Sequence, residues 1–79
     1  MKITPIHWRK LVKVFELDGW KLSRIKGDHL IYTKEGFARP VVIPKDSSVA
    51  TFIILNNLKT AGISRDKYFK LLKASKKLN

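Results

Sequence analysis

The fold is decided by residues 18–33, which read DGWKLSRIKGDHLIYT. Two stretches within it show the period of two that is typical of strands, the first over residues 20–25 and the second over residues 29–33. Between them, residues 26–28 form a short polar run with a central glycine, which is typical of a tight turn. The stretch therefore predicts an antiparallel hairpin.

The same alternation predicts which side chains share a face and how the sheet continues. On the first strand we expect Trp20, Leu22 and Arg24 to lie on one face. A second turn, marked by Glu35-Gly36, leads to a third strand over residues 39–43. Three short strands joined by tight turns make an antiparallel meander.

Helices are predicted on both sides of this meander. Thr4-Pro5 is expected to begin the first helix, since proline is favoured at the first helical position, and Asp18-Gly19 to end it. Residues 49–60 are apolar on nearly every side, and the length of this run favours a second helix. A third helix is expected over residues 65–73, followed by a basic, frayed tail over about 74–79.

The predicted element order is α-β-β-β-α-α, an α+β fold in a single domain over residues 1–79. A three-stranded sheet is not a stable core by itself, so we expect the helices to cover one face of it. The other face is then free to bind a ligand. A chain of 79 residues buries a thin core, so a functional site would be shallow.

Composition points to a polyanionic partner. Seventeen Lys and Arg and six Asp and Glu give a formal net charge of +11. Solubility is served by a net charge of about 2–8 on a small domain, and the excess favours nucleic acid as the partner over a membrane surface. The absence of cysteine excludes disulfides, zinc–cysteine sites and thiol nucleophiles. No signal peptide or membrane span is recognised, so the expected location is the cytoplasm.

His7 and His29 are the two histidines, the residue type that exchanges protons near neutral pH. His7 is predicted to be a surface or capping residue at the start of the first helix. His29 directly follows the glycine turn. RNA cleavage needs a base to activate the ribose 2′-hydroxyl or an acid to protonate the leaving 5′-oxygen, and a histidine can do either. The alternative is a structural histidine that is hydrogen-bonded to Asp28 or to the backbone.

Residues near His29 are candidates for RNA binding. Gly27 would let the backbone approach a phosphate closely, and Arg24 and Lys26 would neutralise its charge. Lys45, in the polar loop after the third strand, is the fourth candidate. The two histidines and six acids are not at metal-ligand spacing, so no metal and no cofactor is expected.

The helix over residues 49–60 has more apolar surface than a sheet can cover. One stripe would pack on the sheet, and three side chains lie on the far side of the helix: Phe52, Ile53 and Asn56. The C-terminal helix covers them in one interpretation. In the other interpretation they form the surface at which a protein partner or a second copy docks.

Four short motifs occur in the order and at the spacing of a known family: residues 18–20, 26–29, 41–44 and 60–64. The ordered set, which spans roughly residues 6–72, resembles the HicA-type toxins, also called YcfA-like proteins. The resemblance implies a fold similar to a double-stranded RNA-binding domain. It also implies a ribosome-independent mRNA endoribonuclease, the toxin of a type II toxin–antitoxin pair.

The resemblance further implies a HicB-like antitoxin as the partner, with an oligomer as one form of the antitoxin complex. It implies His29 as the catalytic residue and Gly27 as the turn glycine of the family's Gly-x-His motif. The chain has Asp28 where serine is commoner, and Asp28 would either orient the imidazole or repel the RNA phosphate. A non-catalytic RNA-binding or protein-interaction module of the same fold is the alternative function.

Overall fold

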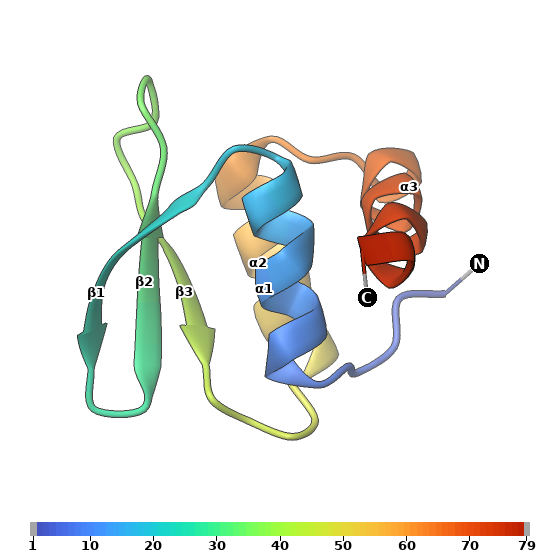
Figure 1. Cartoon of the computed structure of the whole chain (residues 1–79), viewed down its shortest axis with the longest axis horizontal. Coiled ribbons are helices and arrows are strands. Elements are labelled where there is room, and N and C mark those ends of the chain that lie inside the picture. Colours follow the sequence, from blue (N-terminus) through green and yellow to red (C-terminus); the bar gives the residue numbers. More distant parts are fainter. Residues whose placement is uncertain (1, 79) are drawn as a thin grey trace.

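The computed structural model describes residues 2–78, and their helices and strands follow the predicted order (Figure 1). The elements are helix α1 (Trp8–Leu17), strands β1 (Lys21–Lys26), β2 (His29–Thr33) and β3 (Val41–Pro44), helices α2 (Thr51–Ala61) and α3 (Arg65–Ser75), and a short 3-10 helix (Lys76–Leu78). The strands form an antiparallel sheet in the order β1-β2-β3. The α+β class and the α-β-β-β-α-α order are confirmed.

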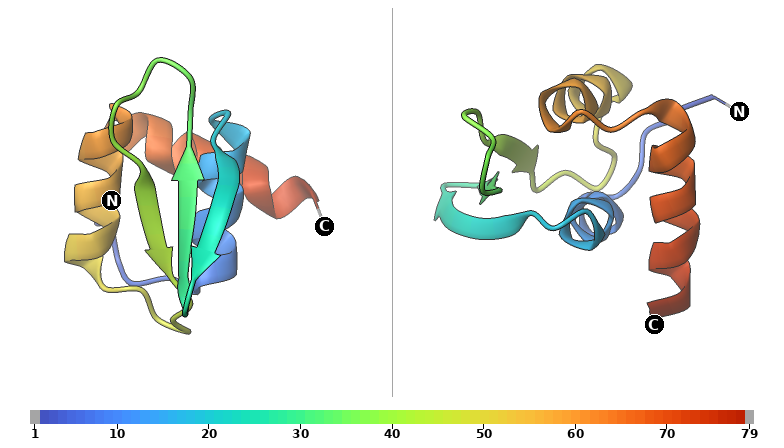
Figure 2. Two further views of the ribbon diagram at one scale, coloured as in Figure 1. Left: turned by 90° about the vertical axis from the view of Figure 1, so that its left-hand side faces the viewer. Right: turned by 90° about the horizontal axis from the view of Figure 1, so that it is seen from above.

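The helices cover one face of the sheet, as predicted. Figure 2 shows α1 and α2 side by side behind the strands, and α3 beyond them as a third layer. The core between these layers is made of buried apolar side chains from α1, β2, β3 and α2, among them Leu11, Phe15, Leu30, Tyr32, Ile43, Ile54 and Leu58. Among residues 2–78, no helix covers the opposite face of the sheet, so this face is open to a ligand (Figure 2).

A bulge in β1 corrects the predicted faces of this strand. Leu22 lies opposite Tyr32 and Arg24 lies opposite Ile31, with a shift of register between the two pairs at Ser23. Residues that lie opposite each other in an antiparallel pair share a face, so Leu22 is on the helix-covered face and Arg24 on the open face. The prediction that these two side chains share a face is wrong, because the period of two is interrupted at the bulge.

Helix α1 begins later than predicted. Thr4-Pro5 lies before it, outside any helix or strand, and the helix begins at Trp8 with His7 as its N-cap. The physical reason is a contact from far along the sequence, in which the Val49 amide donates to the Ile6 carbonyl over 2.8 Å. This bridge holds the segment before the helix in an extended conformation. The expectation that His7 is a capping residue is confirmed.

Other boundaries also differ from the prediction, and α2 begins at Thr51 instead of residue 49. Strand β3 begins at Val41 instead of residue 39, and Val41 is its first residue to pair with β2, opposite Tyr32. Helix α3 continues to Ser75, whose buried hydroxyl donates to the Leu72 carbonyl over 2.6 Å. The predicted frayed tail is therefore helical through residue 78, and its last residue lies outside the described residues.

Two predicted helix caps are confirmed, Gly62 after α2 and Ser64 before α3. Gly62 follows α2 in the left-handed conformation, with a φ of 66°, which a residue with a Cβ adopts only with strain. The Ser64 hydroxyl accepts the Lys67 amide over 3.1 Å and caps α3. Within residues 2–78, no helix has both the length and the apolar composition to cross a membrane.

Candidate functional site

The open face of the sheet carries basic side chains next to His29. Lys26, His29 and Pro44 lie opposite one another across the three strands, and Arg24 lies in the next row, opposite Ile31. Because opposing residues share a face, Arg24, Lys26 and His29 are all on the open face. All three side chains are exposed. The structure thus brings together three of the residues that the sequence predicts for the site.

The turn before His29 needs glycine for its backbone conformation. Gly27 and Asp28 form a two-residue hairpin loop, since Lys26 and His29 on either side are directly paired. Gly27 has a φ of 60°, and positive φ at the first central position is the pattern of a type II′ turn. A Cβ at Gly27 would meet nothing within 4 Å, so the space around the turn is open to a ligand.

The imidazole of His29 is held by its neighbour in the chain. His29 Nδ1 lies 3.2 Å from Asp28 Oδ1. A carboxylate only accepts hydrogen bonds, so in the neutral imidazole this contact places the hydrogen on Nδ1 and leaves Nε2 free to accept a proton. The side chains of His29 and Asp28 are 54% and 79% exposed, so the pair adds little stability but leaves the ring accessible to a ligand.

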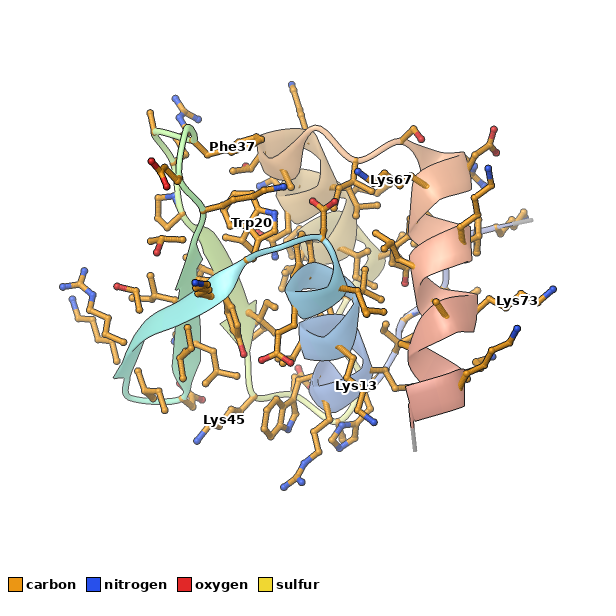
Figure 3. All side chains as sticks on the ribbon, turned by 45° about the horizontal axis from the view of Figure 1, so that its top comes forward. Lys13, Trp20, Phe37, Lys45, Lys67 and Lys73 are labelled. Atoms are coloured by element: carbon orange, nitrogen blue, oxygen red, sulfur yellow. The ribbon has the colours of Figure 1, made fainter. Side chains whose placement is uncertain are left out.

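Lys45 lies beside the same turn but not on the open face. Its amide donates to the Asp28 carbonyl over 2.7 Å, which extends the β2–β3 pairing by one residue. Its side chain extends from the end of β3 at the lower edge of the view in Figure 3. Lys45 Nζ lies 5.9 Å from the centre of the Trp8 ring, at the start of α1. The fourth predicted RNA-binding residue thus lies around the end of the sheet from Lys26.

A cluster around Trp8 was missed by the sequence reasoning. Arg9 Cζ lies 5.0 Å from the centre of the Trp8 ring, and the His7 ring stacks on it at 5.9 Å with an angle of 27° between the planes. His7 Nδ1 also accepts the Arg9 amide over 3.1 Å. The signal in the sequence that could have identified the cluster is the run of aromatic and basic residues over 7–9.

The predicted partner surface on α2 is uncovered in part. Phe52 is 71% exposed, so the interpretation in which the C-terminal helix covers it is wrong. Ile53 is partly buried against the core, and Asn56 is exposed. Ile53 and Asn56 line one side of an open depression of about 370 Å³, and Arg39 and Pro40 line the opposite side. Ile53 and Asn56 thus border the outer edge of β3, while Phe52 is exposed on the same helix.

Asn57 fixes α2 to the outer edge of β3. Its Nδ2 donates to the Val42 carbonyl over 2.9 Å, and the Val42 amide donates to its Oδ1 over 3.4 Å. A side-chain amide thus stands where a neighbouring strand would otherwise pair. This role could not be predicted from the sequence, because residues 56 and 57 are both asparagine and only the orientation of the helix decides which of them faces β3.

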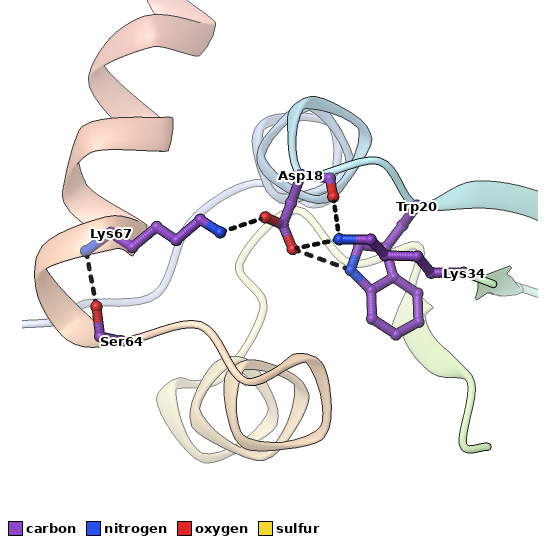
Figure 4. A network of polar contacts seen from close by, with 5 residues as sticks. All are labelled: Asp18, Trp20, Lys34, Ser64 and Lys67. Atoms are coloured by element: carbon purple, nitrogen blue, oxygen red, sulfur yellow. Dashed lines mark hydrogen bonds and ion pairs between the residues drawn. The ribbon is translucent and has the colours of Figure 1, made fainter. Parts of the chain in front are cut away.

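A buried carboxylate joins three parts of the fold (Figure 4). The side chain of Asp18 is 5% exposed and accepts the Trp20 indole N–H over 3.2 Å. Lys67 Nζ lies 2.8 Å from one carboxylate oxygen and Lys34 Nζ lies 3.6 Å from the other. Lys34 also donates to the Asp18 carbonyl over 2.6 Å. The end of α1 is therefore tied to the segment after β2 and to α3.

Two tyrosines lie in the core rather than at the site. Burial, the charge of Glu16 and the hydrogen bond that the phenol donates to Glu16 together raise the pKa of Tyr32 to about 12. Burial also raises the pKa of Tyr68. Neither phenol therefore releases a proton near neutral pH. Within residues 2–78, no group of three or more His, Asp or Glu side chains is placed to hold a metal ion.

A comparison with known protein families covers the part of the chain that carries the candidate site. A family described as the HicA toxin of bacterial toxin–antitoxin systems matches residues 8–63, which include the hairpin, the sheet and α2. No curated protein matches the chain. The family match extends over more than half of the chain and confirms the resemblance that the four ordered motifs indicate. The chain belongs to the HicA toxin family.

Proposed function

We propose that this toxin is a metal-independent endoribonuclease that cleaves mRNA with His29 as its acid–base residue. The observation that supports the proposal most is the position of His29 on an open face, directly across from Lys26 and beside an unobstructed glycine turn. Arg24 adds a second cation on the same face. Such a toxin would act in the cytoplasm, where its substrate is translated.

The proposed chemistry gives a separate role to each of the two imidazole nitrogens of His29. Asp28 accepts the hydrogen on Nδ1, and Nε2 takes the proton of a ribose 2′-hydroxyl. The 2′-oxygen then attacks the adjacent phosphorus, and the bond from phosphorus to the 5′-oxygen breaks. The protonated histidine or water returns a proton to that oxygen. Lys26 and Arg24 offset the negative charge that accumulates on the phosphate in the transition state.

Purified wild-type protein should cleave single-stranded RNA in the presence of EDTA, because the proposed steps use only side chains. The products should carry a 2′,3′-cyclic phosphate on one fragment and a 5′-hydroxyl on the other, which end-group analysis would detect. Loss of cleavage on chelation would contradict the metal-independent mechanism. RNA binding without any cleavage would instead favour the non-catalytic module of the same fold.

Membership of a toxin family implies an antitoxin as partner. We propose that the antitoxin, a HicB-like protein, contacts Phe52, Ile53 and Asn56. Phe52 is the most exposed of the large apolar side chains that the structure describes, and Leu55 on the same helix is also exposed. A large aromatic side chain left in water on a monomer is typical of the centre of a protein interface.

Replacing Phe52 by aspartate should weaken antitoxin binding by roughly 30-fold or more, the loss typical of a central interface residue. The unfolding free energy should change by less than about 0.5 kcal/mol, since the side chain is largely in water. Isothermal titration of a HicB-like antitoxin measures the first quantity and thermal unfolding the second. Ala74→Asp, at an exposed position of α3, is the matched control. Equal antitoxin affinities for both variants would rule out this surface.

A further inference from the structure

We propose that Trp8, Arg9 and Lys45 form a binding subsite for a single-stranded RNA nucleotide that neighbours the scissile one, with its base stacked on Trp8 and its phosphate held by the two cations. The proposal rests on the proposed function, because it concerns the same RNA. It adds a second contact region that lies around the end of the sheet from the open face.

Trp8 is fixed in place yet partly accessible. One side of it packs against the hydrophobic core, and its amide donates to the Asp46 carbonyl over 3.0 Å. The ring is only half-buried, unlike the Trp20 ring, which is 2% exposed. A rigid, half-buried aromatic ring at a protein surface is the kind of platform on which bases of single-stranded nucleic acid stack.

Two cations approach this one ring. Arg9 Cζ lies 5.0 Å and Lys45 Nζ 5.9 Å from its centre. Neither side chain forms an ion pair within the part of the chain that the structure describes. The nearby Asp46 carboxylate accepts the amide of Ser48 over 3.0 Å. Two positive charges near one ring repel each other, and a phosphate shared between them would offset that repulsion.

The subsite is continuous with the turn that carries His29. Lys45 donates its amide to Asp28, and the residue after Lys45 accepts the amide of Trp8. The backbone thus links the catalytic turn to the Trp8 ring through the short segment that follows β3. An RNA strand whose phosphate lies at His29 would place its next nucleotide at Trp8 by following residues 45 and 46 around this end of the sheet.

Binding can be measured without cleavage in a His29→Ala background. The probe is an oligouridylate of about eight nucleotides, within the site sizes of single-strand binding proteins. Tryptophan fluorescence should be quenched on binding, because a stacked base reaches Trp8 while Trp20 is shielded. Trp8→Leu should remove most of the quenching and weaken affinity roughly tenfold or more. Arg9→Ala should weaken affinity while leaving the fold intact, since Arg9 is exposed.

A matched control and a second probe make the outcomes decisive. Lys10→Ala removes one cation from an exposed position of the same helix and should change affinity less than Arg9→Ala does. An abasic strand of the same length should bind more weakly than the oligouridylate and cause little quenching. Equal binding of the two strands, or unchanged affinity in both Trp8→Leu and Arg9→Ala, would overturn the subsite. Failure of the background protein to bind any RNA would instead overturn the proposed function itself.

Discussion

Replacing His29 by alanine should abolish toxicity and slow RNA cleavage by about 10²- to 10⁴-fold, the usual contribution of one general acid–base residue. The fold should survive, because the side chain is 54% exposed and its removal opens no cavity. We expect the unfolding free energy to change by less than about 1 kcal/mol. Initial cleavage rates, growth after induced expression and thermal unfolding measure these three quantities.

Lys26→Ala is the comparison that separates binding from chemistry. Lys26 lies directly across from His29, so its loss should weaken RNA binding more than it slows the chemical step. The log–log salt dependence of binding should become shallower by about 0.7, the value for one lost phosphate contact on a single strand. His29→Ala should leave that slope unchanged. Full cleavage activity in His29→Ala would show that the reaction uses another residue.

Replacing Asp18 by alanine should lower the unfolding free energy by about 2–4 kcal/mol. The substitution leaves the Trp20 indole N–H without its acceptor inside the core, and it removes the ion pairs with Lys34 and Lys67. Both lysines can then return to water, which keeps the loss below that of a fully buried pair. Such a change is a large part of the stability of a small domain.

Urea unfolding of three variants tests this assignment. Glu35→Ala removes an exposed carboxylate near Lys34 in the sequence and should change the unfolding free energy by less than about 0.5 kcal/mol. Asp18→Asn keeps an acceptor for the indole while removing the charge, so its effect should be intermediate. If Asp18→Ala loses no more stability than Glu35→Ala, the network in Figure 4 does not hold the elements together.

The elements that could be predicted from the sequence are those whose cause is local. The turn at Gly27, the glycine after α2 and the serine cap of α3 each depend on one residue and its immediate neighbours. The start of α1 could not be predicted in the same way, since it depends on the pairing of Ile6 with Val49. The bulge in β1 leaves no mark in a simple alternation of apolar and polar residues.

The residues of the candidate site differ in the same way, since local sequence places some of them and tertiary contacts place the others. Lys26, Gly27 and His29 are neighbours in one hairpin, so the sequence alone places them together. The Trp8 cluster depends on Lys45, which reaches α1 only because β3 runs back beside the hairpin. Lys45 and Trp8 are far apart in the sequence, so their proximity in the fold could not be predicted from it.

The edge strands of a sheet have unpaired backbone amides and carbonyls, which can pair with another copy of the chain and cause aggregation. Alternate residues of a strand direct their amides outward, and along the outer side of β3 these are residues 40, 42 and 44. Two of them are prolines without an amide hydrogen, and Asn57 occupies the third. The other edge strand, β1, is interrupted by the bulge and carries Lys21 and Lys26, whose charges repel those of a second copy. Neither edge of the sheet is therefore suited to pair with the sheet of another chain before an antitoxin binds.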